Sequence, residues 1–473
     1  MKSHHKSLMK NKQFLIMEKF ENSIVDKIME QYSKLQTDNC KSREFEEDRA
    51  EERSEYSRDY ARILYSSSFR RLQGKMQILG VESTAFYRNR LTHSLEVSQI
   101  ARSIAKTVSW KCGKEAEMYC DEELYLLDAA ALAHDIGHPA FGHKGERVLD
   151  KIAKKYRLRF EGNAQNFRVL RELDRHGSSP KGLNLTYRTL LAINKYITDE
   201  CNSKGEPPKK FMYHEDYEFL ENFRKENGLN ERTLDVQIIE ISDDIAYAVH
   251  DLEDGLSQGL FTIEEIMHEI KVYDDNQISN DDINKASNEF DEIIKDIKES
   301  LNNEKVNTIQ EYSHLFRKRL TSKLSDDFVK SVGFDSTQKI LCMDATHKAL
   351  CKILSKIIFR GATRSSSIAL YELKGDIIIV SLFNIYFNED INKDYLLLPP
   401  DYRPNKNDDE AKKARCVIDY IAGMMDTYAI SEYERLTGIS YKSIDVSIIP
   451  NVEESKKHFW DYLKSLVCNC KNE

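Results

Sequence analysis

Residues 122–146 read EELYLLDAAALAHDIGHPAFGHKGE, and this stretch decides the fold. Its Leu/Ala-rich first half predicts a buried helix, which Gly137 and Pro139 would end just after the adjacent pair His134–Asp135. An imidazole nitrogen and a carboxylate oxygen side by side can both bind one cation. Without such a cation, burying the carboxylate would be energetically costly. The stretch therefore predicts a helical core that ends in a metal site.

The segment at 91–109, LTHSLEVSQIARSIAKTVS, predicts a second helix of this core. His93 lies one helical turn before an apolar stripe and on the same inward side. The stripe consists of Val97, Ile100, Ala101, Ile104 and Val108. A lone histidine in that place would usually be a hydrogen-bonded core residue. Because the His134–Asp135 pair belongs to the next helix, a shared ligand site is the better interpretation.

Residues 235–256, DVQIIEISDDIAYAVHDLEDGL, predict a third helix. Asp243, Tyr247 and Asp251 follow one another at i, i+4 and i+8, so they share one stripe. The apolar face of the same helix consists of Ile241, Ile245, Ala248, Leu252 and Leu256. Two carboxylates and a phenol beside a face that must be buried predict the wall of a polar cavity.

More polar residues surround the predicted metal site. His138 and His143 follow in the Gly/Pro-containing loop, within reach of a ligand beside the metal, and Glu146 lies three residues after His143. A histidine next to a carboxylate can transfer protons near neutral pH. Arg90 lies one helical turn before His93, and a guanidinium matches the paired oxygens of a phosphate. The pattern favours a phosphorylated ligand.

The composition favours a helical protein. The chain has 473 residues with only 18 glycines and eight prolines, about half the average usage, which argues against collagen-like and turn-rich all-β chains. Its nine cysteines include no CxxC pairs, and no apolar run is long enough for a secretion signal or a membrane span. We therefore expect a cytoplasmic protein that does not interact with membranes.

Charge is unevenly distributed along a chain whose formal net charge is −9. Residues 261–300 contain twelve acidic residues against four lysines, a pattern typical of a solvated helical face. Residues 53–90 contain eight Lys or Arg against three acidic residues. Because a phosphorylated ligand is negatively charged, part of this basic excess is expected to bind it.

We predict an all-α fold with a minor β element in the C-terminal third. The β-branched run DIIIVSLFN at 376–384 predicts a strand. The expected division is 1–54, an N-terminal helix at 13–36 with an exposed segment; 55–260, the catalytic core; 261–360, a charged helical insert; and 361–473, a C-terminal region with the β element and helices.

The motifs resemble those of a known family. His93, His134–Asp135 and Asp243 reproduce the H…HD…D pattern of HD-superfamily metal phosphohydrolases. Within it, the chain resembles the deoxyguanosinetriphosphate triphosphohydrolases (dGTPases) through SSSFRRLQGKMQ, YRNRLTHSLEVSQIARSIA, LAHDIGHPAFGHKGE, FEGNAQNFRVL, LNLTYRTL and DDIAYAVHDLEDGL. The likeness is dense over 55–260, with an echo at 417–429. It implies an HD-type helical core and hydrolysis of dGTP, or other dNTPs, to the deoxynucleoside and tripolyphosphate.

The resemblance also implies roles for individual residues. The metal ligands would be His93, His134, Asp135 and Asp243. Catalysis would use His143, Glu146 and His138, with His138 closest to phosphate. Substrate binding would involve Arg90, Gln77, Tyr247, Asp251, Lys195, Tyr196, Lys210 and Asn163. Asn163 and Gln165 would position water or phosphate, or they could instead cap a helix. One divalent ion would occupy the site, with Mn²⁺ or Mg²⁺ preferred over Fe²⁺, Co²⁺, Ni²⁺ or Zn²⁺.

Partners and alternatives follow from the same resemblance. Family members are commonly homo-oligomers, often hexamers, and single-stranded DNA or a dNTP effector could bind the basic segment. Two other functions stay open: an HD phosphohydrolase of broader range, acting on all dNTPs or on an alarmone, and a nucleic-acid-binding regulatory protein with a residual site. This chain retains every proposed metal and proton-transfer residue. A residual site would not need to retain all of them.

Overall fold

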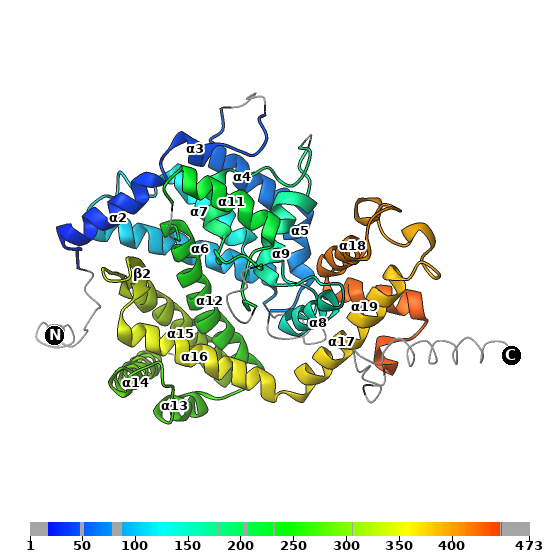
Figure 1. The fold of residues 1–473 in the computed structure, drawn as a ribbon. Coiled ribbons are helices and arrows are strands. Elements are labelled where there is room, and N and C mark those ends of the chain that lie inside the picture. The colour runs from blue at the N-terminus through cyan, green and yellow to red at the C-terminus, as the bar shows by residue number, and fades with distance from the viewer. Residues whose placement is uncertain are drawn as a thin grey trace, which may run out of the picture.

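The computed structural model describes residues 18–47, 52–77, 88–177, 179–201, 207–229, 232–304, 306–444 and 446. Regular structure in these residues is almost entirely helical, so the all-α fold is confirmed (Figure 1). The N-terminal helices are α2 (Asn22–Lys34), α3 (Asp38–Lys41), α4 (Glu55–Tyr65), α5 (Ser67–Arg71), the 3₁₀ turn η1 (Leu72–Gly74), α6 (Arg90–Cys112) and α7 (Asp121–Ala133).

The central helices are α8 (Gly142–Lys155), α9 (Gly162–Arg168), the π-turn η2 (Val169–Leu173), α10 (Tyr187–Ile193), α11 (His214–Glu226), α12 (Leu234–Gln258), α13 (Ile263–Lys271), α14 (Asn280–Asn302) and α15 (Ile309–Ser331). The C-terminal elements are β1 (Val332–Asp335), β2 (Ile340–Met343), α16 (Ala345–Arg364), α17 (Ser366–Phe387), η3 (Lys393–Tyr395), η4 (Pro400–Tyr402), α18 (Glu410–Ala422), α19 (Asp426–Thr437) and η5 (Tyr441–Ser443). Helix α2 falls within the predicted N-terminal helix.

A first hydrophobic core contains α6, α7 and α12, the three helices that carry the predicted site. The apolar stripe of α6 is buried as predicted. Helix α6 begins with a capping box, in which the Asn89 side chain accepts from the Thr92 backbone and the Thr92 hydroxyl accepts from that of Asn89 (3.0 and 3.1 Å). This start places His93 in the first turn of α6, while α7 ends immediately before His134.

A second core joins α8 to the C-terminal helices α17, α18 and α19. Figure 1 shows α17 running from the end of α16 toward α18 and α19. The chain thus passes from the first core, which contains buried residues of α16, to the second, which contains those of α17. The chain itself passes from one core to the other within a few residues, because Ile136 belongs to the first and Ala140 to the second.

The strand predicted at 376–384 is wrong, because these residues lie inside helix α17. Residues Ile377 to Val380 are all buried, and the helix is apolar around its whole circumference where α8, α18 and α19 surround it. A short apolar run has no periodicity that separates a buried helix from a buried strand. Burial on every side therefore outweighed the β propensity of the isoleucines.

The minor β element is a hairpin earlier in the chain. Strands β1 and β2 pair antiparallel, with Val332 opposite Met343 and Asp335 opposite Ile340. This hairpin lies in the segment 261–360 that the sequence assigned to helices alone. Within the described residues, no helix combines the length and apolar character needed to cross a membrane.

Candidate active site

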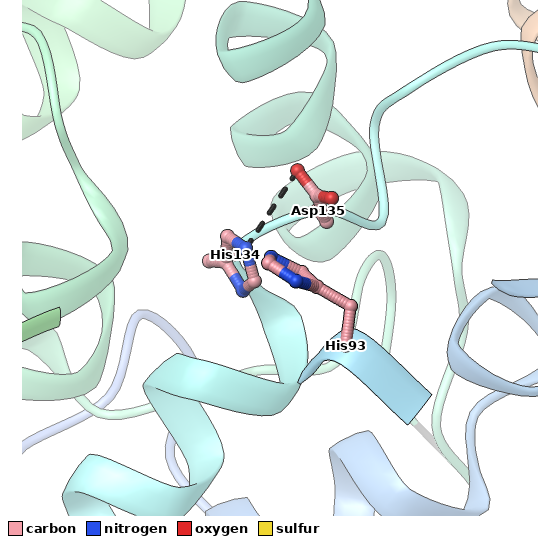
Figure 2. Close-up of side chains that lie close together, drawn as sticks. All are labelled: His93, His134 and Asp135. Atoms are coloured by element: carbon pink, nitrogen blue, oxygen red, sulfur yellow. Dashed lines mark ion pairs between the residues drawn. The ribbon is translucent and has the colours of Figure 1, made fainter. Parts of the chain in front are cut away.

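Four side chains converge where α6, α7 and α12 meet. His93 Nε2 lies 3.1 Å from Oδ1 of Asp243, and His134 Nε2 lies 3.6 Å from the same oxygen. Ligand atoms of His93, His134 and Asp135 all lie within 4.8 Å of one another. Figure 2 shows these three side chains turned toward a common centre. The structure thus brings together the four residues that the sequence proposed as metal ligands.

His134 is oriented as metal-binding histidines are. Its Nδ1 lies 2.6 Å from the carbonyl oxygen of Ala131, so Nδ1 carries the proton and Nε2 faces the site. Nε2 is buried without a hydrogen-bond partner, and the nearest carboxylate oxygens, of Asp135 and Asp243, are 3.8 and 3.6 Å away. Two imidazole nitrogens and two carboxylates could therefore hold a divalent cation.

The electrostatics of the cluster favour a positive charge at its centre. Burial disfavours a charged imidazole, yet Asp135 and Asp243 raise the pKa of His134 to about 9. Burial also opposes ionisation of Asp135, but His138, Arg90 and His134 outweigh it and hold its pKa well below the usual value. Burial likewise opposes ionisation of Asp243, but His134 and His93 outweigh it and hold its pKa well below the usual value. Both carboxylates are therefore ionised at neutral pH.

Arg90 has a different partner from the one predicted. Its guanidinium pairs with Oδ2 of Asp135, whose Oδ1 lies 2.9 Å from His138 Nδ1. Arg90 is buried and also lines the cavity described below. Helical spacing correctly predicted that Arg90 lies beside the metal site. Spacing could not show that the Arg90 guanidinium would form an ion pair with the Asp135 carboxylate. Its role as a phosphate clamp stays a prediction.

A second cluster contains His138, His143 and Glu146. The two imidazole rings have their centroids 5.6 Å apart, and His143 Nδ1 lies 3.1 Å from Oε2 of Glu146. Burial raises the cost of ionising Glu146, but contacts with His143, His138 and Lys210 keep its pKa far below the usual value. A carboxylate is thus held against one face of an imidazole that is 68 % exposed.

A cavity of about 650 Å³ lies in front of these clusters. The predicted residues that line it are Gln77, Arg90, His93, His134, Asp135, His138, His143, Asn163, Lys195, Tyr196, Lys210, Asp243 and Tyr247. Glu146 and Asp251 do not line it. The volume is in the range of small-molecule sites.

Two lysines reach the cavity from the segment that joins α10 to α11. Lys195 Nζ lies 3.5 Å from Oδ2 of Asp243, and Lys210 Nζ lies 2.5 Å from Glu161 and 3.5 Å from Glu146. Burial opposes charge on Lys195, but Asp243 outweighs burial and raises its pKa. Both lysines are therefore cationic beside the predicted metal ligands.

The stripe of α12 behaves partly as predicted. Tyr247 lines the cavity, while Asp251 lies one turn further along and is 1 % exposed. Burial raises the pKa of Asp251 to about 7, and its Oδ2 has no hydrogen-bond partner. Oε1 of Gln77 is likewise buried without a partner. Unpartnered buried acceptors are uncommon and point to a missing donor.

Gln165 has a structural position, but it is not the helix cap that the alternative interpretation expected. Its amide donates to Asp419 (2.9 Å) and accepts from the Tyr213 hydroxyl (3.1 Å), and it does not line the cavity. Asn163 does line the cavity and donates to Glu161 (2.9 Å). The helix cap itself is Glu161, which accepts from the backbone of Ala164.

Sequence reasoning missed one wall of the cavity. It comes from the junction of α16 and α17 and includes Phe359, Thr363, Ile368 and Glu372. Phe359 is 55 % exposed there. No motif distinguishes these residues in the sequence. An apolar side chain on a helix, such as Phe359, is predicted equally well to be part of the hydrophobic core.

Most cations of the basic segment at 53–90 are engaged within the protein. Arg58 and Arg62 pair with Glu47, Arg88 pairs with Glu96, Glu253 and Asp254, and Lys75 is buried against backbone carbonyls. Of the described cations in this segment, only Arg90 lines the cavity. The basic excess therefore serves mainly internal ion pairing, and within this segment the predicted phosphate contact rests on Arg90.

Comparisons with known proteins agree with this architecture. The family profile described as "HD domain" matches residues 90–248, and the one described as "Phosphohydrolase-associated domain" matches residues 341–435. The first match contains all four predicted metal ligands. The second spans the missed cavity wall at the junction of α16 and α17.

The curated relatives carry related names. A deoxyguanosinetriphosphate triphosphohydrolase-like protein 2 of Vibrio cholerae is 41 % identical over 393 residues, covering 82 % of this chain and 90 % of the relative. Like-named proteins of Rickettsia felis and Deinococcus radiodurans are 33 % and 32 % identical, each covering 83 % of this chain and 94 % of the relative. The chain therefore belongs to the deoxyguanosinetriphosphate triphosphohydrolase-like family of HD-domain phosphohydrolases.

Proposed function

We propose that this protein is a metal-dependent triphosphohydrolase that converts dGTP, and other dNTPs to a lesser extent, to the deoxynucleoside and tripolyphosphate. One observation carries the proposal. A cluster of two histidines and two carboxylates opens onto a cavity of about 650 Å³ that is also lined by Arg90, Lys195 and Lys210. A metal site beside several cations suits a polyphosphate better than a neutral ligand.

His93, His134, Asp135 and Asp243 would hold one divalent ion. The orphaned Nε2 of His134 and the ionised carboxylates fit such an ion. When bound, the ion neutralises phosphate oxygens and lowers the pKa of water. The donor set suits Mn²⁺ or Mg²⁺ best, and Fe²⁺, Co²⁺, Ni²⁺ or Zn²⁺ also accept it.

His143 is the proposed proton-transfer residue. Glu146 holds its Nδ1, so Nε2 points away from the carboxylate and is available to a ligand in the cavity. His138 is held by Asp135 beside the metal ligands, where an imidazole can donate to a phosphate oxygen. The two histidines thus have separate tasks in the proposal.

The phosphate tail would lie along Lys195, Tyr196 and Lys210. The lysines project from the α10–α11 segment and carry their charges beside Asp243 and Glu161. A bound polyphosphate, accompanied by a metal ion, can replace Asp243 and Glu161 as the ion-pair partner of the two lysines. The deoxyribose would pack on Tyr247, with its 3′-hydroxyl directed to the unpartnered oxygens of Asp251 and Gln77.

The proposal includes a cellular setting. We infer a cytoplasmic homo-oligomer, up to a hexamer, that responds to a dNTP or single-stranded DNA effector. The resemblance to dGTPases supports this inference, and mass photometry with and without each effector tests it.

Product analysis tests the proposed reaction directly. Purified protein is incubated with each dNTP and each NTP, with Mn²⁺ or Mg²⁺, and the products are identified by chromatography and phosphorus NMR. Deoxyguanosine with intact tripolyphosphate is expected, and the His134→Ala variant, which lacks one proposed ligand, should give neither. Stepwise release of orthophosphate or pyrophosphate would contradict the reaction type. Equal turnover of all dNTPs would favour the enzyme of broader range, and salt-dependent nucleic-acid binding without turnover would favour the regulatory protein.

A further inference from the structure

Two buried charged side chains contact the connection between α7 and α8, residues 134–141, and neither of them lines the cavity. Asp426, in the first turn of α19, is 0 % exposed, and Lys75, beside η1, is 2 % exposed. Neither belongs to the proposed metal or proton-transfer groups. Buried charges are rarely retained without a specific set of partners.

Asp426 accepts hydrogen bonds from two backbone donors and one hydroxyl. Its Oδ1 accepts from the Phe141 N–H (3.1 Å), and its Oδ2 accepts from the Met76 N–H (3.1 Å) and the Tyr371 hydroxyl (3.0 Å). These partners belong to three separate parts of the chain. One carboxylate of the C-terminal region thus fixes both the end of the α7–α8 connection and the residue before Gln77.

Lys75 holds the same connection at a second point. Its ammonium donates to the carbonyl oxygens of His138 and of Ala422, the latter at 3.2 Å. Ala422 is the last residue of α18, so this side chain also joins the connection to the C-terminal helices. Burial raises the pKa of Asp426, and the nearby charge of Lys75 offsets part of this rise, so the two side chains interact electrostatically.

The backbone of the connection needs such support. Phe141 has φ = 61° and Gly142 has φ = 59°, and the left-handed region is unfavourable for an aromatic residue. The Phe141 ring packs against Gly375 of α17, where an added Cβ would lie 2.5 Å from the ring. His138 lies just before this strained turn, and His143 lies just after it.

We propose that Lys75 and Asp426 form a brace through which the C-terminal helices set the position of His138 and His143. Both are positioning residues, because they touch the backbone of the connection and not the cavity. The proposal rests on the proposed function only for the effect on turnover. A shift of about 1 Å in a catalytic group can cost roughly 10²-fold in rate, so loss of the brace should reduce kcat.

Two variants remove the brace from opposite ends. Asp426→Asn keeps the shape, but its amide nitrogen must face one of the two backbone N–H groups, so one donor loses its acceptor. Lys75→Met keeps much of the side-chain volume and removes both bonds to carbonyls. Glu432→Gln is the matched control, since Glu432 also lies on α19, is 8 % exposed and accepts from Tyr386 (2.7 Å) far from the connection.

Three quantities are measured on the full-length protein: bound metal, steady-state kinetics, and hydrogen exchange of peptides covering residues 137–143. In Asp426→Asn and Lys75→Met we expect unchanged metal content and faster hydrogen exchange at 137–143. We also expect kcat to fall by up to about tenfold, while KM changes by less than about threefold. The double variant should lose less than the product of the single effects, because both act on one connection. Glu432→Gln should be less stable and yet retain kcat and slow exchange at 137–143.

Unchanged exchange at 137–143 in both brace variants would overturn the proposal, as would a Glu432→Gln variant that reproduces their kcat loss. If the variants do not fold, the wild-type protein decides: the Phe141 amide should exchange as slowly as the hydrogen-bonded amides of α19 from Ala429 onward, and rapid exchange would refute the brace. If wild-type protein hydrolyses no nucleotide, the proposed function fails, while exchange and metal content still test the brace.

Discussion

Nδ1 of His143 lies 3.1 Å from Oε2 of Glu146, and the backbone N–H of Gly162 donates to the other oxygen of the same carboxylate (3.2 Å). The carboxylate is therefore anchored by the start of α9 while it orients an imidazole at the start of α8. An exposed histidine with a fixed ring orientation is suited to proton transfer.

Replacing His143 by Ala should lower kcat by at least roughly 10²-fold, the usual contribution of a general acid or base. Metal content and affinity for a non-hydrolysable dGTP analogue, measured by calorimetry, should be unchanged because other residues supply those contacts. Lys144→Ala is a control, since Lys144 neighbours His143 but pairs with Asp376 (3.3 Å). If affinity falls and kcat does not, His143 is a phosphate ligand instead.

Replacing Asp135 or Asp243 by Ala should abolish metal retention and turnover in a protein that still folds. Each change removes a carboxylate of the proposed ligand set. Asp128→Ala is the matched control, because Asp128 is a buried carboxylate of α7 that pairs with Ser98 and Arg102 and does not line the cavity. Elemental analysis checks the outcome, and full metal occupancy in Asp135→Ala would exclude that residue from the ligand set.

The wild-type enzyme should prefer dGTP over both GTP and 2′,3′-dideoxy-GTP. In the proposed binding mode, the 2′-hydroxyl of GTP would clash with Tyr247, whereas dideoxy-GTP would leave Asp251 without its hydrogen-bond donor. An unpaired buried acceptor costs roughly 1–3 kcal/mol, about tenfold to a few hundredfold in kcat/KM.

In the Asp251→Asn variant, the difference in kcat/KM between dGTP and its dideoxy analogue should become smaller. It should shrink more than the difference in kcat/KM between dGTP and GTP. The measurement is kcat/KM for the three nucleotides in both proteins. An unchanged dideoxy penalty would indicate that Gln77 alone reads the 3′-hydroxyl.

His347 should make stability depend on pH. It lies 2.8 Å from Asp344 and 3.0 Å from Glu289, and these carboxylates outweigh burial and raise its pKa to about 9. An unfolded histidine titrates near 6.5. The ion pairing of charged His347 thus adds about 3 kcal/mol at most to the free energy of unfolding. This stabilisation is complete below pH 6.5 and is lost as the pH rises through 9.

Urea unfolding at several pH values tests this. The His347→Gln variant should lose most stability relative to wild type at pH 6 and little at pH 9.5. His314→Gln, an exposed position on α15, should leave the pH profile unchanged. An equal loss at both pH values would mean that His347 contributes by packing and not by its charge.

Sequence reasoning was most successful where periodicity is strong. Helices α6, α7 and α12 each carry a long apolar face, so their burial and the direction of His93 and Asp243 followed from spacing. It failed where chemistry depends on partners far apart in the chain. The pairing of Arg90 with Asp135 and the bonds of Gln165 to Asp419 and Tyr213 are not encoded in local spacing.

The C-terminal region was the least predictable part. The isoleucines of α17 have a β propensity that only surrounding helices could overcome, and the cavity wall at Phe359 carries no polar signature. The brace at Asp426 was equally hidden, since a single acidic residue in a helix start usually serves the helix dipole.

The passage of the chain from one core at Ile136 to the other at Ala140 has a consequence for heat inactivation. Partial melting of the second core would release His138 and His143 while the first core still holds its helices. Activity should therefore disappear at a lower temperature than helical structure does. The temperature at which activity is lost would then depend on the contact between the two hydrophobic cores. Substitutions that stabilise this contact would raise that temperature more than substitutions that stabilise either core by the same free energy.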